Sequence, residues 1–182
     1  MNNKNKFIDD NKNIERILLH IATNLHTTKK DDNRVKALSI FKIIENQYWL
    51  GYYYQQGYGS LEIDETKAME YLKKSIHIEN YPDAMCRYAI HLIKTSERKE
   101  DGKIKDKEIQ FEITHLFRKA ALLNNNDGCY FYRDIIYNRK LGNEANKLEG
   151  FTFINQAAEK GHDKAKLLLE KITRNFNSFT RF

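Results

Sequence analysis

One helical pattern occurs four times in the amino-acid sequence, and this repetition restricts the fold more than any other feature. Each copy starts with one residue that is followed three, four and seven positions later by mostly apolar residues. This spacing places all four side chains on one face of an α-helix. The copies are Ala37, Ile40, Phe41, Ile44; Ala68, Tyr71, Leu72, Ser75; Ile113, Leu116, Phe117, Ala120; and Gly150, Phe153, Ile154, Ala157.

A second type of helix is predicted between these copies. Its members start at Asn46, Ala84, Gly128 and Ala165, at intervals of 38, 44 and 37 residues. Two helices in a period of this length are typical of an α-solenoid, in which each unit buries its apolar face against its neighbours. The longest interval contains the charged segment 95–107, which we interpret as a surface loop that is dispensable for packing.

The composition agrees with an all-α fold. Only one proline and eight glycines occur in 182 residues, and 41% of the residues are hydrophobic. Such a chain can bury a core, and it lacks the turn residues of an all-β fold.

The segment around the first complete helix pair carries a specific set of residues. They are Leu50, Gly51, Tyr54, Gly57 and Gly59, followed by Asp64, Lys67, Ala68, Tyr71 and Lys74. This order resembles the Sel-one-like repeat family, relatives of the tetratricopeptide repeat, with the pattern A-x-x-x-L-G-x-x-Y-x-x-G-x-G and then D-x-x-K-A-x-x-W/Y-x-x-K-A-A-x-x-G-x-x-x-A.

The other repeats match this pattern less fully. The second keeps Ala84 and Lys119-Ala120-Ala121, and the third keeps AAEKGHDKA at 157–165. Segment 31–42 resembles the second helix of a preceding half repeat. The resemblance therefore implies a right-handed superhelix of repeats over 31–172. An N-terminal segment 1–30 would hold a disordered start and a capping helix near 14–27, and 173–182 would form a C-terminal tail.

Several of these residues have a physical role in such a repeat. A glycine at position 51 lets a neighbouring helix approach closely, and glycines 57 and 59 form the turn that ends the helix. Asp64 is placed to cap the next helix, and Gly161 ends a later one. The predicted structural positions are Leu50, Gly51, Tyr54, Gly57, Gly59, Asp64, Ala68, Ala84, Ala120, Ala157 and Gly161.

Catalytic and cofactor sites are not predicted. The glycines at 57 and 59 lack the third glycine of a dinucleotide loop, because position 62 is Glu62. The six histidines do not show metal-ligand spacing, and no nucleophile or phosphate-loop motif occurs. We therefore expect no enzyme activity, no metal and no cofactor.

Nucleic-acid binding and a membrane location are also not favoured. Basic and acidic residues number nine and six over 1–60, twelve and twelve over 61–120, and ten and seven over 121–182, so the net charge of +6 is spread thinly. No Lys or Arg accompanies the tyrosines within 46–66.

The first twenty residues do not form a signal peptide, no apolar run could span a bilayer, and Cys86 and Cys129 suit a reducing compartment. These features predict a cytoplasmic protein.

The resemblance implies that the first helix of each repeat lines a concave face that binds a partner. The positions three, seven and ten after each start are Trp49, Tyr53, Gln56; Arg87, His91, Lys94; and Phe131, Ile135, Asn138. Trp, Tyr and Arg often carry the binding energy of protein interfaces. In the alternative interpretation, Trp49 and Phe131 pack on the neighbouring repeat.

The predicted function is a non-catalytic scaffold or adaptor that binds another protein, such as a signalling or secretion component. One alternative is a cytosolic immunity protein that neutralises a bacterial toxin. A second alternative is an RNA-binding helical repeat protein.

Overall fold

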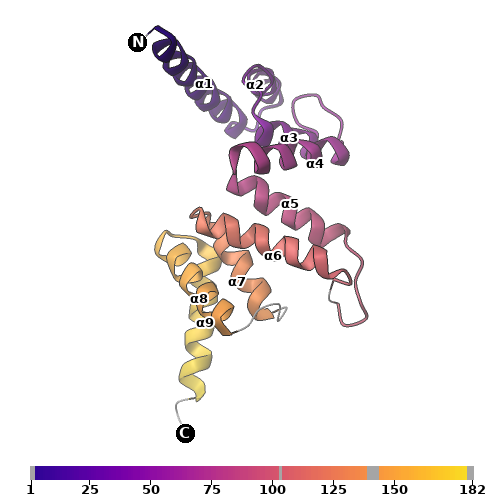
Figure 1. The fold of residues 1–182 in the computed structure, drawn as a ribbon, viewed down its shortest axis with the longest axis vertical. Coiled ribbons are helices and arrows are strands. Elements are labelled where there is room, and N and C mark those ends of the chain that lie inside the picture. The colour runs from indigo at the N-terminus through magenta and orange to yellow at the C-terminus, as the bar shows by residue number, and fades with distance from the viewer. Residues whose placement is uncertain (1–2, 103, 139–143, 180–182) are drawn as a thin grey trace. The chain divides into compact units, whose positions relative to one another are not determined.

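The computed structural model describes residues 3–102, 104–138 and 144–179, and their side chains over 9–102, 104–136 and 147–174. All regular elements of this part are helical, and the only β-pairing is an isolated bridge between Arg98 and Ile104 (Figure 1). The all-α fold agrees with the prediction. The elements are α1 (Asn3–Thr27), α2 (Asp31–Ile43), α3 (Gln47–Gln56), α4 (Glu65–Lys74), the π-helical turn η1 (Ser75–Glu79), α5 (Pro82–Thr95), α6 (Lys107–Leu122), α7 (Asn126–Asn138), α8 (Glu144–Glu159) and α9 (Asp163–Phe179).

The chain divides into two compact units. The first is Met1–Glu79 and the second is Asn80–Phe182. In the first unit α1 packs on α2, α2 on α3, and α3 on α4. Its core combines side chains from the first three helices, namely Ala22, Ala37, Leu38, Phe41, Leu50 and Tyr53.

The helix pair α3–α4 has the local geometry that its motif indicates. A Cβ atom on Gly51 would lie 3.0 Å from Leu72 Cγ and 3.1 Å from the Ala68 carbonyl oxygen, so the missing side chain lets α4 approach. Gly57 ends α3 with a left-handed φ of 67°. Asp64 caps α4 by accepting a hydrogen bond of 2.9 Å from the Lys67 backbone N–H.

The second unit continues the same arrangement. Successive helices α5 to α9 pack on one another, and α5 also contacts α7. The repeat alanines Ala84, Ala120 and Ala157 are fully buried here. The segment between α5 and α6 is a loop, as predicted, but Ile104 within it is only 5% exposed. The loop therefore contributes to packing, contrary to the prediction that it is dispensable, because its apolar side chain lies inside.

A residue in the left-handed conformation precedes each first helix from α3 onwards. These residues are Glu45, Asn80, Asn124 and Gly161, with φ of 50°, 49°, 61° and 91°. The sequence motif marked only Gly161. Two of the others bind a lysine of the same repeat, since Lys119 Nζ donates to Asn80 Oδ1 at 2.7 Å and Lys160 Nζ donates to Asn124 Oδ1 at 3.0 Å.

The two end helices are longer than expected. Helix α1 starts at Asn3, whereas the sequence predicted a disordered start before a helix near 14–27. Helix α9 continues to Phe179 and includes most of the predicted tail, of which residues 180–182 lie outside the described part. Neither segment contains a glycine or proline that would end a helix, which accounts for the difference.

Candidate protein-binding surface

The first helix of the first complete repeat, α3, carries an aromatic cluster. Trp49 is half-buried and stacks on Phe41 with ring centroids 5.0 Å apart and an interplanar angle of 4°. This stacking is the contact expected if Trp49 packs on a neighbouring helix. Part of the indole nevertheless stays exposed. Gln56, one helical turn beyond the cluster, is exposed.

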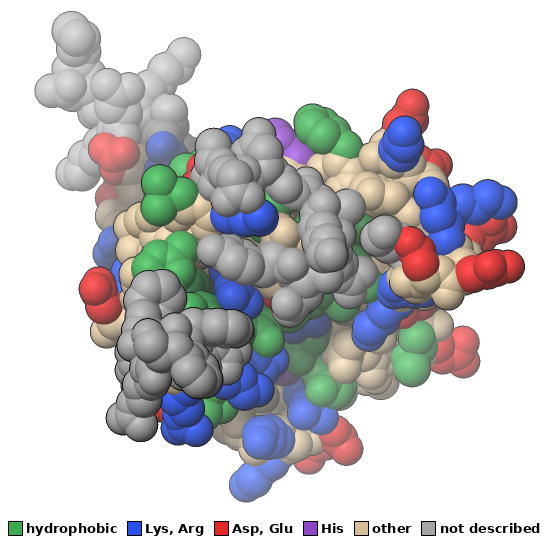
Figure 2. Space-filling model, turned by 90° about the horizontal axis from the view of Figure 1, so that it is seen from below, with side chains coloured by type: hydrophobic (Ala, Val, Ile, Leu, Met, Phe, Trp, Pro, Cys, Tyr) green, Lys and Arg blue, Asp and Glu red, His purple; other side chains and the backbone are tan. Residues whose placement is uncertain are grey.

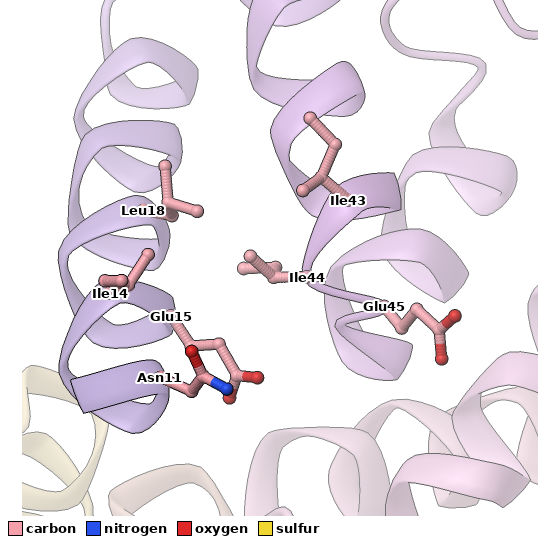
Figure 3. A pocket seen from close by; sticks show the side chains of 7 residues that line it. All are labelled: Asn11, Ile14, Glu15, Leu18, Ile43, Ile44 and Glu45. Atoms are coloured by element: carbon pink, nitrogen blue, oxygen red, sulfur yellow. The ribbon is translucent and has the colours of Figure 1, made fainter. Parts of the chain in front are cut away.

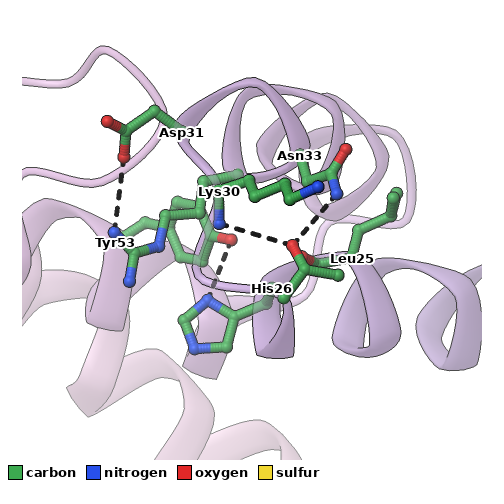
Figure 4. Close-up of polar contacts among 8 residues, drawn as sticks. Leu25, His26, Lys30, Asp31, Asn33 and Tyr53 are labelled. Atoms are coloured by element: carbon green, nitrogen blue, oxygen red, sulfur yellow. Dashed lines mark hydrogen bonds and ion pairs between the residues drawn. The ribbon is translucent and has the colours of Figure 1, made fainter.

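Tyr53 was predicted to face a partner, but it is fully buried. Its hydroxyl is hydrogen-bonded to His26 Nδ1 of α1 at 3.1 Å (Figure 4). Burial raises the pKa of Tyr53 to about 12. The prediction is wrong for this residue because α3 is covered on two sides, by α2 and by α4, rather than on one.

His26 is a centre of the aromatic cluster that the sequence motif did not indicate. Its ring centroid lies 4.9 Å from that of Trp49, 5.6 Å from that of Tyr52 and 5.7 Å from that of Tyr58. Both tyrosines are half-buried, so their rings stay partly accessible where Tyr53 does not. We call Trp49, Tyr52 and Tyr58 the aromatic surface of the first unit.

A cation also reaches this aromatic surface. The Arg34 guanidinium lies 3.9 Å from the ring centroid of Tyr58, and its Nη1 is 3.4 Å from Asp31 Oδ1. No cation was expected beside these rings because 46–66 contains no Lys or Arg, whereas Arg34 comes from α2. No signal within the motif could have revealed this contact.

Tyr54 packs between the two helices of its own repeat. It is half-buried and stacks on Tyr71 of α4, with ring centroids 5.6 Å apart and an interplanar angle of 7°. Lys67 Nζ lies 5.5 Å from the Tyr54 centroid. The adjacent tyrosines 53 and 54 therefore both serve packing, against different helices.

In the second unit the predicted residues of α5 remain accessible. Arg87 and His91 are half-buried and Lys94 is exposed. Their spacing of four and three residues places them along one face of α5.

On the surface drawn in Figure 2, Lys and Arg side chains are interleaved with acidic and hydrophobic ones, which agrees with the spread of charge in the sequence.

Helix α7 adds aromatic side chains beside α5. Phe131 is half-buried and stacks on Phe117, with centroids 5.1 Å apart, while Tyr130 is half-buried and was not predicted. Lys164 Nζ of α9 lies 5.9 Å from the Tyr130 centroid and 6.0 Å from that of Phe131. We call Arg87, His91, Lys94, Tyr130 and Phe131 the first-helix surface of the second unit.

Two predicted residues of α7 do not belong to this surface. Ile135 is only 2% exposed, which corrects its assignment as a contact residue. It lies four residues after Phe131 and is buried because α7 packs on α5, α6 and α8. The side chain of Asn138 lies outside the described part.

A polar cluster joins three helices of the second unit. Arg118 of α6 makes hydrogen bonds of 2.7 to 3.1 Å to both carboxylate oxygens of Glu149 on α8. The Tyr132 hydroxyl of α7 donates to Glu149 Oε2 at 2.7 Å. The Arg118 guanidinium lowers the pKa of Glu149, which keeps this carboxylate ionised.

The two thiols are not arranged for nucleophilic chemistry. Cys86 and Cys129 are buried and unpaired, and burial raises the pKa of both. Among the described residues, no group of three or more histidine, cysteine or acidic side chains could hold a metal ion. In the same part of the chain, no helix is long and apolar enough to cross a membrane.

Comparison with known proteins places this arrangement in a class. The crystal structure of a Sel1 repeat protein from Oxalobacter formigenes superposes with a TM-score of 0.60 and 20% sequence identity. The match covers 79% of this chain and 55% of that protein, so this chain spans about half of its length. No family model and no curated protein sequence matches the chain.

The fold is therefore an α-solenoid of helical repeats. Within that class it is the fold of a Sel1 repeat protein, as the motif around Gly51 predicted.

Proposed function

We propose that this chain is a non-catalytic scaffold that binds a protein partner through the first helices of its repeats. The observation that carries the proposal is the first-helix surface of the second unit, where basic side chains of α5 lie on a helix that contacts the aromatic α7. Trp, Tyr and Arg are the residue types that most often dominate the energetics of protein interfaces.

The aromatic surface of the first unit supports the same role. Trp49, Tyr52 and Tyr58 are held by contacts to His26 and Arg34, so their exposed edges are positioned before a partner binds. Preorganised side chains lose little entropy on binding. Because fold alone does not define function, the proposal rests on these surfaces and not on the superposition.

The test is capture of partners from the native organism by tagged protein, followed by mass spectrometry. The double variant Arg87→Glu, Lys94→Glu should lose the specific partner. The control variant Lys99→Glu, Lys107→Glu makes the same change of charge at two exposed lysines outside this surface and should retain the partner. Circular dichroism should show the same helicity for both.

The outcome also separates the alternatives. A protein captured equally by both variants would contradict the proposed surface. Loss of capture after nuclease treatment, together with a salt-dependent shift of single-stranded RNA, would favour RNA binding. A toxin as the specific partner would make the chain an immunity protein that uses the same surface.

A further inference from the structure

A second surface lies on the first unit, at the groove between α1 and the end of α2. It has a volume of about 330 Å³ and is lined by Asn11, Ile14, Glu15, Leu18, Ile43, Ile44 and Glu45. Figure 3 shows Ile14 and Leu18 extending from α1 towards Ile44. None of these residues belongs to the aromatic surface of the first unit or to the first-helix surface of the second unit.

The floor of this groove is apolar and open. Ile14 is 54% exposed and Ile43 is 72% exposed. Ile17 and Ile21 of α1 are also exposed, and their spacing with Ile14 extends the apolar stripe along this helix. An exposed apolar stripe of this kind has the character of a contact face.

The rim of the groove is negative. Glu15 and Glu45 line it, and within the described residues neither carboxylate has an ion-pair or hydrogen-bond partner. Helix α2 ends at Ile43, so its C-terminal carbonyl groups add partial negative charge at the same place. Lys12, Arg16 and Lys42 lie on the two helices but do not line the groove.

Glu45 is itself an unusual choice for its position. It adopts a left-handed φ of 50°, where the equivalent turns have Asn80, Asn124 and Gly161. Asn and Gly tolerate this conformation better than Glu. Glu45 lines the edge of the groove, and Figure 3 shows its carboxylate directed away from α1, so this strained residue places a negative charge at the outer rim, which points to a role in binding.

We propose that this groove binds an amphipathic helix of a partner protein that carries basic residues beside its apolar stripe. The partner's apolar residues contact the isoleucines and Leu18, and its lysines or arginines pair with Glu15 and Glu45. The whole chain has a net charge of +6, so non-specific attraction would select acidic partners instead. A preference for a basic helix would therefore have to come from the local negative charge of the groove and not from the net charge of the chain.

The test measures fluorescence anisotropy with a labelled amphipathic peptide made of leucine and lysine, and with a matched leucine and glutamate peptide. The full chain should bind the lysine peptide at least about tenfold more tightly than the glutamate peptide. The variant Glu15→Lys, Glu45→Lys should reverse this preference. The control Glu62→Lys, Glu70→Lys changes two other exposed acids of the same unit and should leave it unchanged.

A variant of the apolar floor completes the test. Ile43→Ser alters an exposed side chain and should weaken binding of the lysine peptide several-fold without changing the melting temperature. Equal binding of both peptides, or unchanged binding by Glu15→Lys, Glu45→Lys, would overturn the proposal. A peptide-free dimer that Ile43→Ser dissociates would also overturn it, because a second copy would then be the occupant.

Discussion

At the scale of single residues, the pair Tyr53 and His26 links the first and third helices inside the core. Tyr53 is fully buried, and its hydroxyl has a partner in His26. A buried hydroxyl needs such a partner, because desolvation without a hydrogen bond is unfavourable. This pair therefore holds α1 on the first repeat.

Removal of this hydroxyl should destabilise the chain. We expect Tyr53→Phe to lower the free energy of unfolding by about 0.5–1.5 kcal/mol, and Tyr53→Ala by about 3–5 kcal/mol because it also leaves a cavity. Urea denaturation measures both values. Tyr54→Phe is the control, since within the described residues no hydrogen bond to the Tyr54 hydroxyl is found. An equal loss in both Phe variants would contradict a specific role of the His26 contact.

The raised pKa of Tyr53 makes stability depend on alkaline pH. Its folded pKa of about 12 lies above the ordinary tyrosine pKa of about 10, so the folded state favours the neutral phenol. The contribution of the neutral phenol to the free energy of unfolding is complete below pH 10, and it is lost as the pH rises from 10 towards 12. The melting temperature of the wild type should therefore fall more steeply over this range than that of Tyr53→Phe, and parallel curves would refute the assignment.

At the scale of elements, close helix approach and left-handed turns define the repeats. Helix α4 lies against Gly51 of α3, and four turns end in a left-handed residue before a first helix. Both features depend on the backbone conformation or on the space beside it. Glycine is therefore favoured at these positions, although three of the four left-handed turn residues are not glycine.

Gly51→Ala should be destabilising. The new Cβ would lie 3.0 Å from Leu72 Cγ and 3.1 Å from a backbone oxygen, so α4 has to move, and we expect a loss of about 1–3 kcal/mol. Gly150→Ala is the matched control in another helix, because its Cβ would make an ordinary contact of 3.4 Å with Arg133 Cα. It should be neutral or slightly stabilising, as alanine favours helices. Thermal unfolding of the two variants distinguishes these results.

Relief of the strained turn before α3 should have the opposite effect. We expect Glu45→Gly to raise the free energy of unfolding by about 0.5–1 kcal/mol, since glycine adopts φ of 50° without strain. Glu45→Ala should give no such gain, because alanine retains a Cβ in the left-handed region. Chemical denaturation of both variants is the measurement, and an equal gain would mean that the charge of Glu45, rather than its backbone, is unfavourable.

At the scale of the whole molecule, the chain divides into two compact units. Phe117 is fully buried in the second unit, and Phe41 is fully buried in the first. In repeat proteins each unit contacts mainly its neighbours, so stability is not uniform along the chain.

A core variant should therefore act mainly on its own unit. Phe117→Ala is expected to cost about 3–5 kcal/mol and to reduce amide hydrogen-exchange protection in α6, α7 and α8 more than in α1 to α3. Phe41→Ala is the reciprocal variant and should give the reverse pattern. A uniform loss of protection in either variant would show that the two units unfold as one.

The sequence alone predicted the helix pairs, the turn at Gly57 and the repeat class, although not the full length of α1 and α9. The spacing around Gly51 and the cap at Asp64 depend on interactions between residues close along the chain, which periodicity and turn chemistry report directly. The superposition on a Sel1 repeat protein at 20% identity confirms this level of the prediction.

The tertiary structure alone decided which side chains of the first helices remain accessible. Tyr53 and Ile135 occupy the predicted contact positions, yet each is buried because its helix is packed by more than one neighbour. His26 and Arg34 reach the aromatic surface from α1 and α2, which no motif within α3 records. The physical reason is that helical periodicity defines one buried face of an isolated helix, whereas a helix inside a repeat array is covered on two.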